Sequence, residues 1–327
     1  MPYYPEKKPE PSGEKRQQIK MTEKQTRLLR LSAAAVFCFM ILYGAVRLIL
    51  YITDLNASRN TSQELQQVYE QEMPETGTVA LTPEPTVFST PLPTAIPESP
   101  APAETPVAET TGNLLQPVKY PDNPDLMISE RFRQLRKKGK YIIGWLCFDQ
   151  VDEAVVQKDN TYFLNRDAKG KKNSNGAIFL DSGISLYSRP YTLILYGHNM
   201  KSGNMFGRLK KYKEIAYFRN HRMITFDTMY EDGQYAVFAV MEMSTTPGVA
   251  RWYDLWSLTT NNFTDREAAI RTLEKRSAVS STLDVQADDQ ILLLVTCLDG
   301  DTERLVVAAR RLREGETEGS LTIRQSR

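Results

Sequence analysis

Thiol and imidazole groups are scarce in this chain, so few residues could carry covalent chemistry. The 327 residues include two histidines, His198 and His221, and three cysteines, Cys38, Cys147 and Cys297. An odd number of widely spaced cysteines predicts neither a disulfide framework nor a zinc site. A thiolate served by an imidazole base can act as a nucleophile in acyl transfer. That reaction requires one of these thiols and one of these imidazoles to meet.

Cys297 and His198 each follow an apolar run that is typical of a buried strand. Cys297 comes directly after ILLLVT, and His198 comes after LILYG. A group at the end of a strand is held by a rigid scaffold and can still reach a substrate. The alternatives are a small buried core thiol for Cys297 and a loop histidine without a role for His198. His221, within FRNHRM, is typical of an ordinary surface residue.

An arginine opens the next apolar run, RLVVAARR. A hairpin between this run and the preceding one places Arg304 beside Cys297, where a guanidinium can donate hydrogen bonds to an oxyanion. Arg310 and Arg311 are alternatives on the same strand. Arg310 shares a face with Arg304 but lies about 20 Å farther along, at roughly 3.3 Å per residue. Distance therefore favours Arg304.

The elements that must position these residues are short strands between turn residues. We expect strands in the run YIIGWLCF and at Ala154–Val156, Ala177–Leu180, Thr192–Leu195, Met223–Phe226, Tyr235–Met241, Ile291–Val295 and Leu305–Ala308. We expect helices at Asp125–Lys138, Met205–Tyr212 and Asp265–Arg276, the last capped by Thr264. Many short strands with few helices predict a mainly β barrel or sandwich. Cys147, inside the first strand, is expected to be a core residue.

The N-terminal part of the chain has the composition of a membrane anchor. Residues 1–30 are rich in Lys and Arg, and residues 31–52 form an apolar run long enough to cross a bilayer as one helix. A cleaved signal peptide is the alternative, but its apolar region is usually shorter. The basic flank predicts a cytoplasmic N-terminus with the rest of the chain outside the cell.

The remaining boundaries follow from composition. We expect residues 53–118 to be a stalk followed by a Pro- and Thr-rich spacer, residues 119–313 to be the catalytic domain, and residues 314–327 to be a polar tail. The net charge of +1 gives no indication of a nucleic-acid partner. The pentapeptide at Met73–Gly77 resembles a sorting motif of the L-P-x-T-G kind, but linker composition already explains it.

The ordered segments YGHNM, TC and RLVV resemble the His, Cys and Arg segments of sortases. The stretch from 196 to 212, the stretch from 144 to 181 and the helix between 264 and 276 resemble class B of that family. The resemblance covers about 120–313 and the N-terminal anchor. Two positions depart from it: Leu298 replaces a residue that is often polar or acidic, and Val295 replaces a frequent Ser.

The resemblance implies an eight-stranded β-barrel with N-terminal helices and a helix inserted before the strand that carries Cys297. It implies that Cys297 attacks a threonine carbonyl in the sorting motif of a secreted protein. His198 would act as general acid and base, and Arg304 would stabilise the oxyanion. An amine of a peptidoglycan precursor would then accept the acyl group, outside the membrane of a Gram-positive bacterium. No metal or cofactor is implied.

The resemblance also names candidate substrate contacts. Asn160 and Leu164, in the segment DNTYFL, match positions that line the motif groove, and Tyr253 belongs to a loop expected to form another wall. Two other functions remain open at this point. One is a pilin-polymerising sortase whose acceptor is a protein lysine, and the other is a catalytically silent surface domain that binds peptides or cell wall.

Overall fold

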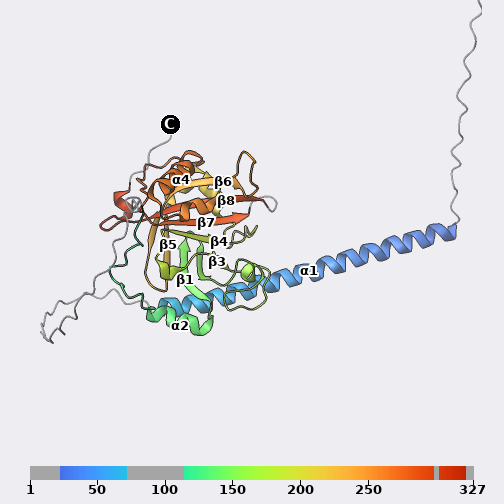
Figure 1. Cartoon of the computed structure of the whole chain (residues 1–327). Coiled ribbons are helices and arrows are strands. Elements are labelled where there is room, and N and C mark those ends of the chain that lie inside the picture. The colour runs from blue at the N-terminus through green and yellow to red at the C-terminus, as the bar shows by residue number, and fades with distance from the viewer. Residues whose placement is uncertain (1–22, 72–113, 298–301, 322–327) are drawn as a thin grey trace, which may run out of the picture. The chain divides into compact units, whose positions relative to one another are not determined.

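The computed structural model describes residues 23–71, 114–297 and 302–321 (Figure 1). It divides the chain into two compact units, Met1–Thr53 and Asp54–Arg327. The predicted cytoplasmic segment up to residue 22, the Pro-rich spacer from 72 to 113 with its Met73–Gly77 pentapeptide, and residues 322–327 lie outside the described residues.

The second unit contains a closed barrel of eight strands in the order β1-β2-β3-β4-β7-β8-β6-β5. This confirms the predicted fold. The strands are β1 Ile142–Phe148, β2 Val151–Val156, β3 Ile178–Leu180, β4 Thr192–Tyr196, β5 Met223–Thr228, β6 Gln234–Ser244, β7 Ile291–Cys297 and β8 Glu303–Arg311. Neighbouring strands are antiparallel except for the pairs β2–β3 and β4–β7, which are parallel.

The β4–β7 pair forms the centre of the barrel core. The side chains from Thr192 to Leu195 in β4 and from Ile291 to Thr296 in β7 are all buried. Continuous burial explains why both sequences are apolar runs rather than alternating patterns. The two strands that lead to His198 and Cys297 are therefore held in the close-packed core.

The helices differ from the predictions in several places. The helices are α1 Glu23–Gln71, α2 Glu130–Lys138, α3 Ile215–Asn220 and α4 Phe263–Lys275, with short 3-10 helices η1 Tyr162–Asn165, η2 Leu186–Ser188, η3 Leu209–Lys213, η4 Leu255–Thr259 and η5 Glu318–Ser320. The helix predicted for residues 205–212 is wrong, because that stretch is a loop that enters η3. Helix α4 is the predicted insertion before β7, but its N-cap is Asn262, whose side chain accepts a hydrogen bond from the Asp265 amide.

In the first unit, α1 is apolar and its side chains are exposed. The helix has 49 residues and contains an 18-residue window with a mean hydropathy of 2.2. It is therefore long and apolar enough to cross a membrane.

In the second unit, the part of α1 after Asp54 is helical and packs against the barrel, where the sequence predicted a stalk. Leu65 and Tyr69 are buried, and the Tyr69 ring stacks on Trp145 of β1 with its centroid 4.5 Å away. Tyr69 also donates a hydrogen bond from its hydroxyl to the carboxylate of Asp227. The expected domain boundary at residue 119 therefore leaves out a helical segment that belongs to the barrel unit.

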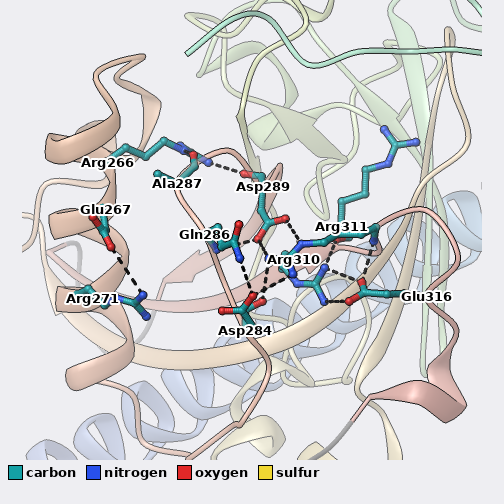
Figure 2. A network of polar contacts seen from close by, with 11 residues as sticks. Arg266, Glu267, Arg271, Asp284, Gln286, Ala287, Asp289, Arg310, Arg311 and Glu316 are labelled. Atoms are coloured by element: carbon teal, nitrogen blue, oxygen red, sulfur yellow. Dashed lines mark hydrogen bonds and ion pairs between the residues drawn. The ribbon is translucent and has the colours of Figure 1, made fainter. Parts of the chain in front are cut away.

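The end of β8 is joined to the segment that follows it by ion pairs (Figure 2). The guanidinium of Arg310 is fully buried and makes two hydrogen bonds to Glu316, of 2.7 and 3.1 Å. Arg313 is paired with Asp284 at 2.9 Å and with Asp289 at 2.7 Å. The beginning of the expected polar tail thus packs on the barrel.

Candidate active site

The register between β4 and β7 places the ends of the two strands beside each other. Tyr196 is paired with Val295, and the Gly197 amide donates to the Val295 carbonyl at 3.2 Å. The Thr296 hydroxyl donates to the Gly197 carbonyl at 2.7 Å. His198 lies two residues beyond Tyr196, and Cys297 lies two residues beyond Val295. The parallel pairing therefore brings the two predicted catalytic positions to the same edge of the barrel.

Strand β8 brings Arg304 to that edge. In the antiparallel β7–β8 ladder, Cys297 is directly opposite Arg304, and Thr296 is opposite Leu305. Opposed residues in such a ladder have their Cα atoms roughly 4.5–5.5 Å apart. The structure thus confirms the hairpin that the sequence predicted.

A cavity of about 320 Å³ opens at this edge. It is lined by Asn160, Leu164, Phe179, Tyr196, Gly197, His198, Val295, Thr296 and Arg304. Four of the six predicted site residues are in this group: Asn160, Leu164, His198 and Arg304. The backbone of Cys297 continues from Val295 and Thr296 at the same edge.

The backbone of the His198 loop is held tightly. The His198 carbonyl accepts hydrogen bonds from the amides of Met200 at 3.0 Å and Phe206 at 3.1 Å. Its half-buried imidazole has Nε2 2.7 Å from the Leu164 carbonyl oxygen. The ring is therefore in contact with the segment that contributes one wall of the cavity.

Arg304 is half-buried, and one of its guanidinium nitrogens donates to the Glu303 carbonyl at 3.0 Å. Within the described part of the chain, no carboxylate forms an ion pair with it. Arg310, its rival in the sequence analysis, is opposite Ile291 at the far end of the same ladder and pairs with Glu316. Arg304 alone of the two lines the cavity.

The carboxylate of Asp181 is buried next to two residues that line the cavity. Asp181 is 2% exposed and accepts hydrogen bonds from the Tyr196 hydroxyl at 3.0 Å and the Asn160 amide group at 3.2 Å. It also accepts from the Gly183 amide at 2.8 Å. Burial, followed by the charge of Asp181, raises the pKa of Tyr196, so this phenol stays protonated and keeps donating. Asp181 therefore orients two lining side chains.

Three other residues singled out in the sequence lie away from this cavity. Tyr253 is buried and donates from its hydroxyl to the Ala269 carbonyl at 3.0 Å, so it is not brought together with the other substrate-contact candidates. His221 stacks on Tyr217 with ring centroids 4.0 Å apart. Cys147, expected in the core, is exposed on β1, which corrects that prediction. Its pKa is raised by desolvation and then by nearby carboxylates, which disfavours the reactive thiolate.

Sequence reasoning missed Tyr196, Thr296 and Asp181. Tyr196 and Thr296 stand within two residues of His198 and Cys297, so adjacency at a strand end was an available signal. Asp181 is a carboxylate directly after the apolar run of β3, which was a weaker signal. No group of three or more His, Cys, Asp or Glu side chains that could hold a metal ion occurs among the residues that the structure describes.

Comparisons with known proteins agree with this geometry. The family model of the sortase domain matches residues 150–312. Sortase B of Listeria monocytogenes is 29% identical over 194 residues, which covers 58% of this chain and 74% of that protein. Sortase B of Staphylococcus aureus is 29% identical over 189 residues, covering 56% and 75%. A crystal structure of a protein similar to sortase B from Bacillus anthracis has a TM-score of 0.55 at 26% identity, over 79% of this chain and 96% of that one.

The barrel, the cavity at the ends of β4, β7 and β8, and these relatives define a cysteine transpeptidase: the chain belongs to the sortase family. Within the family it is a class B sortase, because both curated relatives are sortase B proteins and the solved structure is described as similar to sortase B.

Proposed function

We propose that this sortase cleaves a sorting motif after a threonine and transfers the acyl group to an amine of a peptidoglycan precursor. The observation that carries the proposal is the strand register, which brings the positions of His198, Cys297 and Arg304 to one edge beside a single cavity. A thiol can serve as the nucleophile of acyl transfer to an amine, an imidazole as its acid–base group and a guanidinium as its oxyanion donor.

In the first half of the reaction, the Cys297 thiolate attacks the threonine carbonyl carbon and forms a C–S bond. The electron pair moves to the carbonyl oxygen, and the Arg304 guanidinium stabilises that oxyanion. Protonated His198 then gives its proton to the leaving nitrogen. The C–N bond breaks, and the products are a thioester and a free amine.

In the second half, the acceptor amine attacks the thioester carbonyl. Neutral His198 takes one proton from the amine nitrogen as the new C–N bond forms. The C–S bond breaks and the Cys297 thiolate is restored. Two acyl transfers through a thioester replace the direct attack of a weak amine nucleophile on a stable amide.

The cavity supplies the binding surface for the motif in this proposal. Asn160 presents a polar side chain and Leu164 an apolar one, both from the stretch between β2 and β3. Phe179 and Val295 add further apolar surface. The substrates proposed are secreted proteins that carry a C-terminal sorting motif.

The proposed location is the cell membrane, with the N-terminus in the cytoplasm and the barrel outside. This rests on the apolar part of α1 and on the basic residues before it. A reporter fused after Arg327 should register as extracytoplasmic, and a cytoplasmic signal would contradict the orientation.

The test of the function uses the full chain in detergent micelles, a library of pentapeptide-containing substrates and mass spectrometry. We expect a thioester adduct on Cys297 and loss of the segment after the threonine. Cys297→Ala should remove both adduct and cleavage, whereas Cys147→Ala, a matched control on β1, should keep both. An adduct that persists in folded Cys297→Ala would disprove the nucleophile.

A further inference from the structure

The contact between His198 and Leu164 identifies which ring nitrogen carries a fixed hydrogen. Nε2 of His198 lies 2.7 Å from the carbonyl oxygen of Leu164. A carbonyl oxygen can only accept a hydrogen bond, so Nε2 must carry the hydrogen and donate it. A neutral imidazole has a single N–H, which leaves Nδ1 without one. The hydrogen bond at one nitrogen thus decides the state of the other.

The Leu164 carbonyl is presented by a segment whose backbone is tied on both sides. The Phe163 carbonyl accepts a hydrogen bond from the Ala177 amide at 3.0 Å, and the Asn165 carbonyl accepts from the Asn173 amide at 2.9 Å. The Leu164 amide donates to Thr161 at 3.2 Å. The neighbouring carbonyls are therefore committed to the backbone, while the one between them faces the imidazole.

Gly176 is the residue that allows this approach. Its φ of +66° lies in the left-handed region, where a side chain is strained. A Cβ atom at this position would lie 2.6 Å from the Phe163 carbonyl oxygen, 2.9 Å from that of Leu164 and 3.0 Å from Cδ2 of His198. Any side chain would push the carbonyl and the ring apart.

We propose that the Leu164 carbonyl holds His198 as the Nε2–H tautomer, that Nδ1 is the nitrogen that takes and gives the proton in acyl transfer, and that Gly176 is the positioning residue that makes this arrangement possible. The inference rests on the proposed role of His198 as general acid and base. It deepens that role by assigning the transferred proton to one atom.

The arrangement links the substrate wall to the acid–base group. Leu164 lines the cavity and also holds the imidazole through its carbonyl. A displacement of this segment therefore changes the position of the His198 imidazole, which must protonate the leaving amine. A shift of about 1 Å in a catalytic group can cost on the order of 10²-fold in rate.

The first experiment measures the tautomer in the full chain in detergent micelles with 15N-labelled histidine. The chain has only two histidines, so His221→Gln assigns the two rings directly. At a pH where the ring is neutral, we expect the Nε2 resonance of His198 to be of the protonated type and Nδ1 of the unprotonated type. A neutral ring with its hydrogen on Nδ1 in the otherwise unaltered protein would overturn the proposal, and this measurement needs no substrate.

The second experiment compares Gly176→Ala with Gly170→Ala. Gly170 also has a positive φ, of +83°, but a Cβ atom there would meet only the Tyr162 hydroxyl at 3.4 Å. Both variants carry the backbone strain, and only Gly176→Ala disturbs the Leu164–His198 contact. We expect Gly176→Ala to lose the fixed tautomer and on the order of 10²-fold in kcat, with KM changed less, whereas Gly170→Ala keeps the tautomer and stays within several-fold of the unaltered enzyme.

An unchanged tautomer in folded Gly176→Ala, or an equal loss of kcat in both variants, would overturn the role of Gly176. Full turnover by His198→Ala would instead disprove the proposed function, and the tautomer measurement would still stand. The two failures are therefore distinguishable.

Discussion

Arg304 is directly opposite Cys297 in the ladder between β7 and β8, and Arg310 is opposite Ile291 at the other end of the same ladder. The two arginines share a strand but have different surroundings. Arg304 lines the cavity and is half-buried, whereas the guanidinium of Arg310 is fully buried and bonded to Glu316. Their substitution should therefore affect different properties of the enzyme.

Arg304→Ala should lower kcat by on the order of 10²–10³-fold, because it removes an oxyanion donor. Arg304→Lys should rescue poorly, since an ammonium group lacks the planar fork of donors. Alkylation of Cys297 should continue in both variants. Near-normal turnover by folded Arg304→Ala would remove this residue from the mechanism.

Arg310→Ala is the matched variant on the same strand. It removes a fully buried guanidinium and leaves the partly exposed Glu316 carboxylate with the Arg313 amide as a remaining donor. A hydrogen bond to a charged group contributes about 1.5–3 kcal/mol. We expect a clear loss in the free energy of urea unfolding and a kcat per folded molecule within a few-fold of the unaltered enzyme. A large loss of kcat without a loss of stability would contradict the assignment of the two arginines.

Asp181→Asn should weaken binding of the sorting motif. The substitution keeps the shape of the side chain but replaces one acceptor oxygen with a donor group. Tyr196 and Asn160 donate to Oδ2 and the Gly183 amide donates to Oδ1, so the Asn side chain cannot accept from both the two cavity-lining residues and Gly183. Hydrogen bonds to a buried carboxylate contribute about 1.5–3 kcal/mol each, so KM for the donor peptide should rise by about tenfold while kcat changes less.

Asp289→Asn is the control for Asp181→Asn, because Asp289 is also a buried carboxylate and pairs with Arg313 away from the cavity. It should lower stability and leave KM unchanged. Equal KM values for the two variants would indicate that Asp181 acts only through stability.

A chain that begins at Asp54 should fold, and one that begins at Lys119 should be much less stable. The shorter chain lacks Leu65 and Tyr69, exposes the face of Trp145 on which Tyr69 stacks, and leaves Asp227 without the Tyr69 hydroxyl. Burial of one large side chain alone contributes roughly 1.5–3 kcal/mol. Urea unfolding of the two purified chains measures the difference, and equal midpoints would show that the segment after Asp54 contributes little.

The stability of the barrel unit should fall as pH rises through the interval in which Glu153 ionises. Desolvation raises the pKa of Glu153 from 4.5 to about 7, with Asp152 adding to the shift and the hydrogen bond from Ser62 opposing it. The folded state therefore holds this proton more tightly than the unfolded state, and stability declines between these two values. Glu153→Gln should flatten that decline in urea unfolding measured on either side of the interval. A decline of the same size in the variant would exclude Glu153 as its source.

The sequence by itself determined the main strands and the family resemblance, which implied the barrel, and it named the candidate reacting groups. Apolar runs of strand length indicated β4 and β7. Cys297 ends β7 and His198 comes two residues after β4, and both are positions where a rigid scaffold meets a loop. The hairpin to Arg304 followed from sequence proximity. These inferences succeeded because strand formation and a short hairpin depend on neighbours along the chain.

Only the tertiary structure decided which distant residues support those groups. The Leu164 carbonyl lies 34 positions before His198, and Asp181 lies 15 before Tyr196, so no local pattern indicates that they touch. The exposure of Cys147, the burial of Tyr253 and the packing of the helix after Asp54 were missed for the same reason. Which face of an element is covered depends on the strands and helices that close over it, and that arrangement exists only once the barrel has formed.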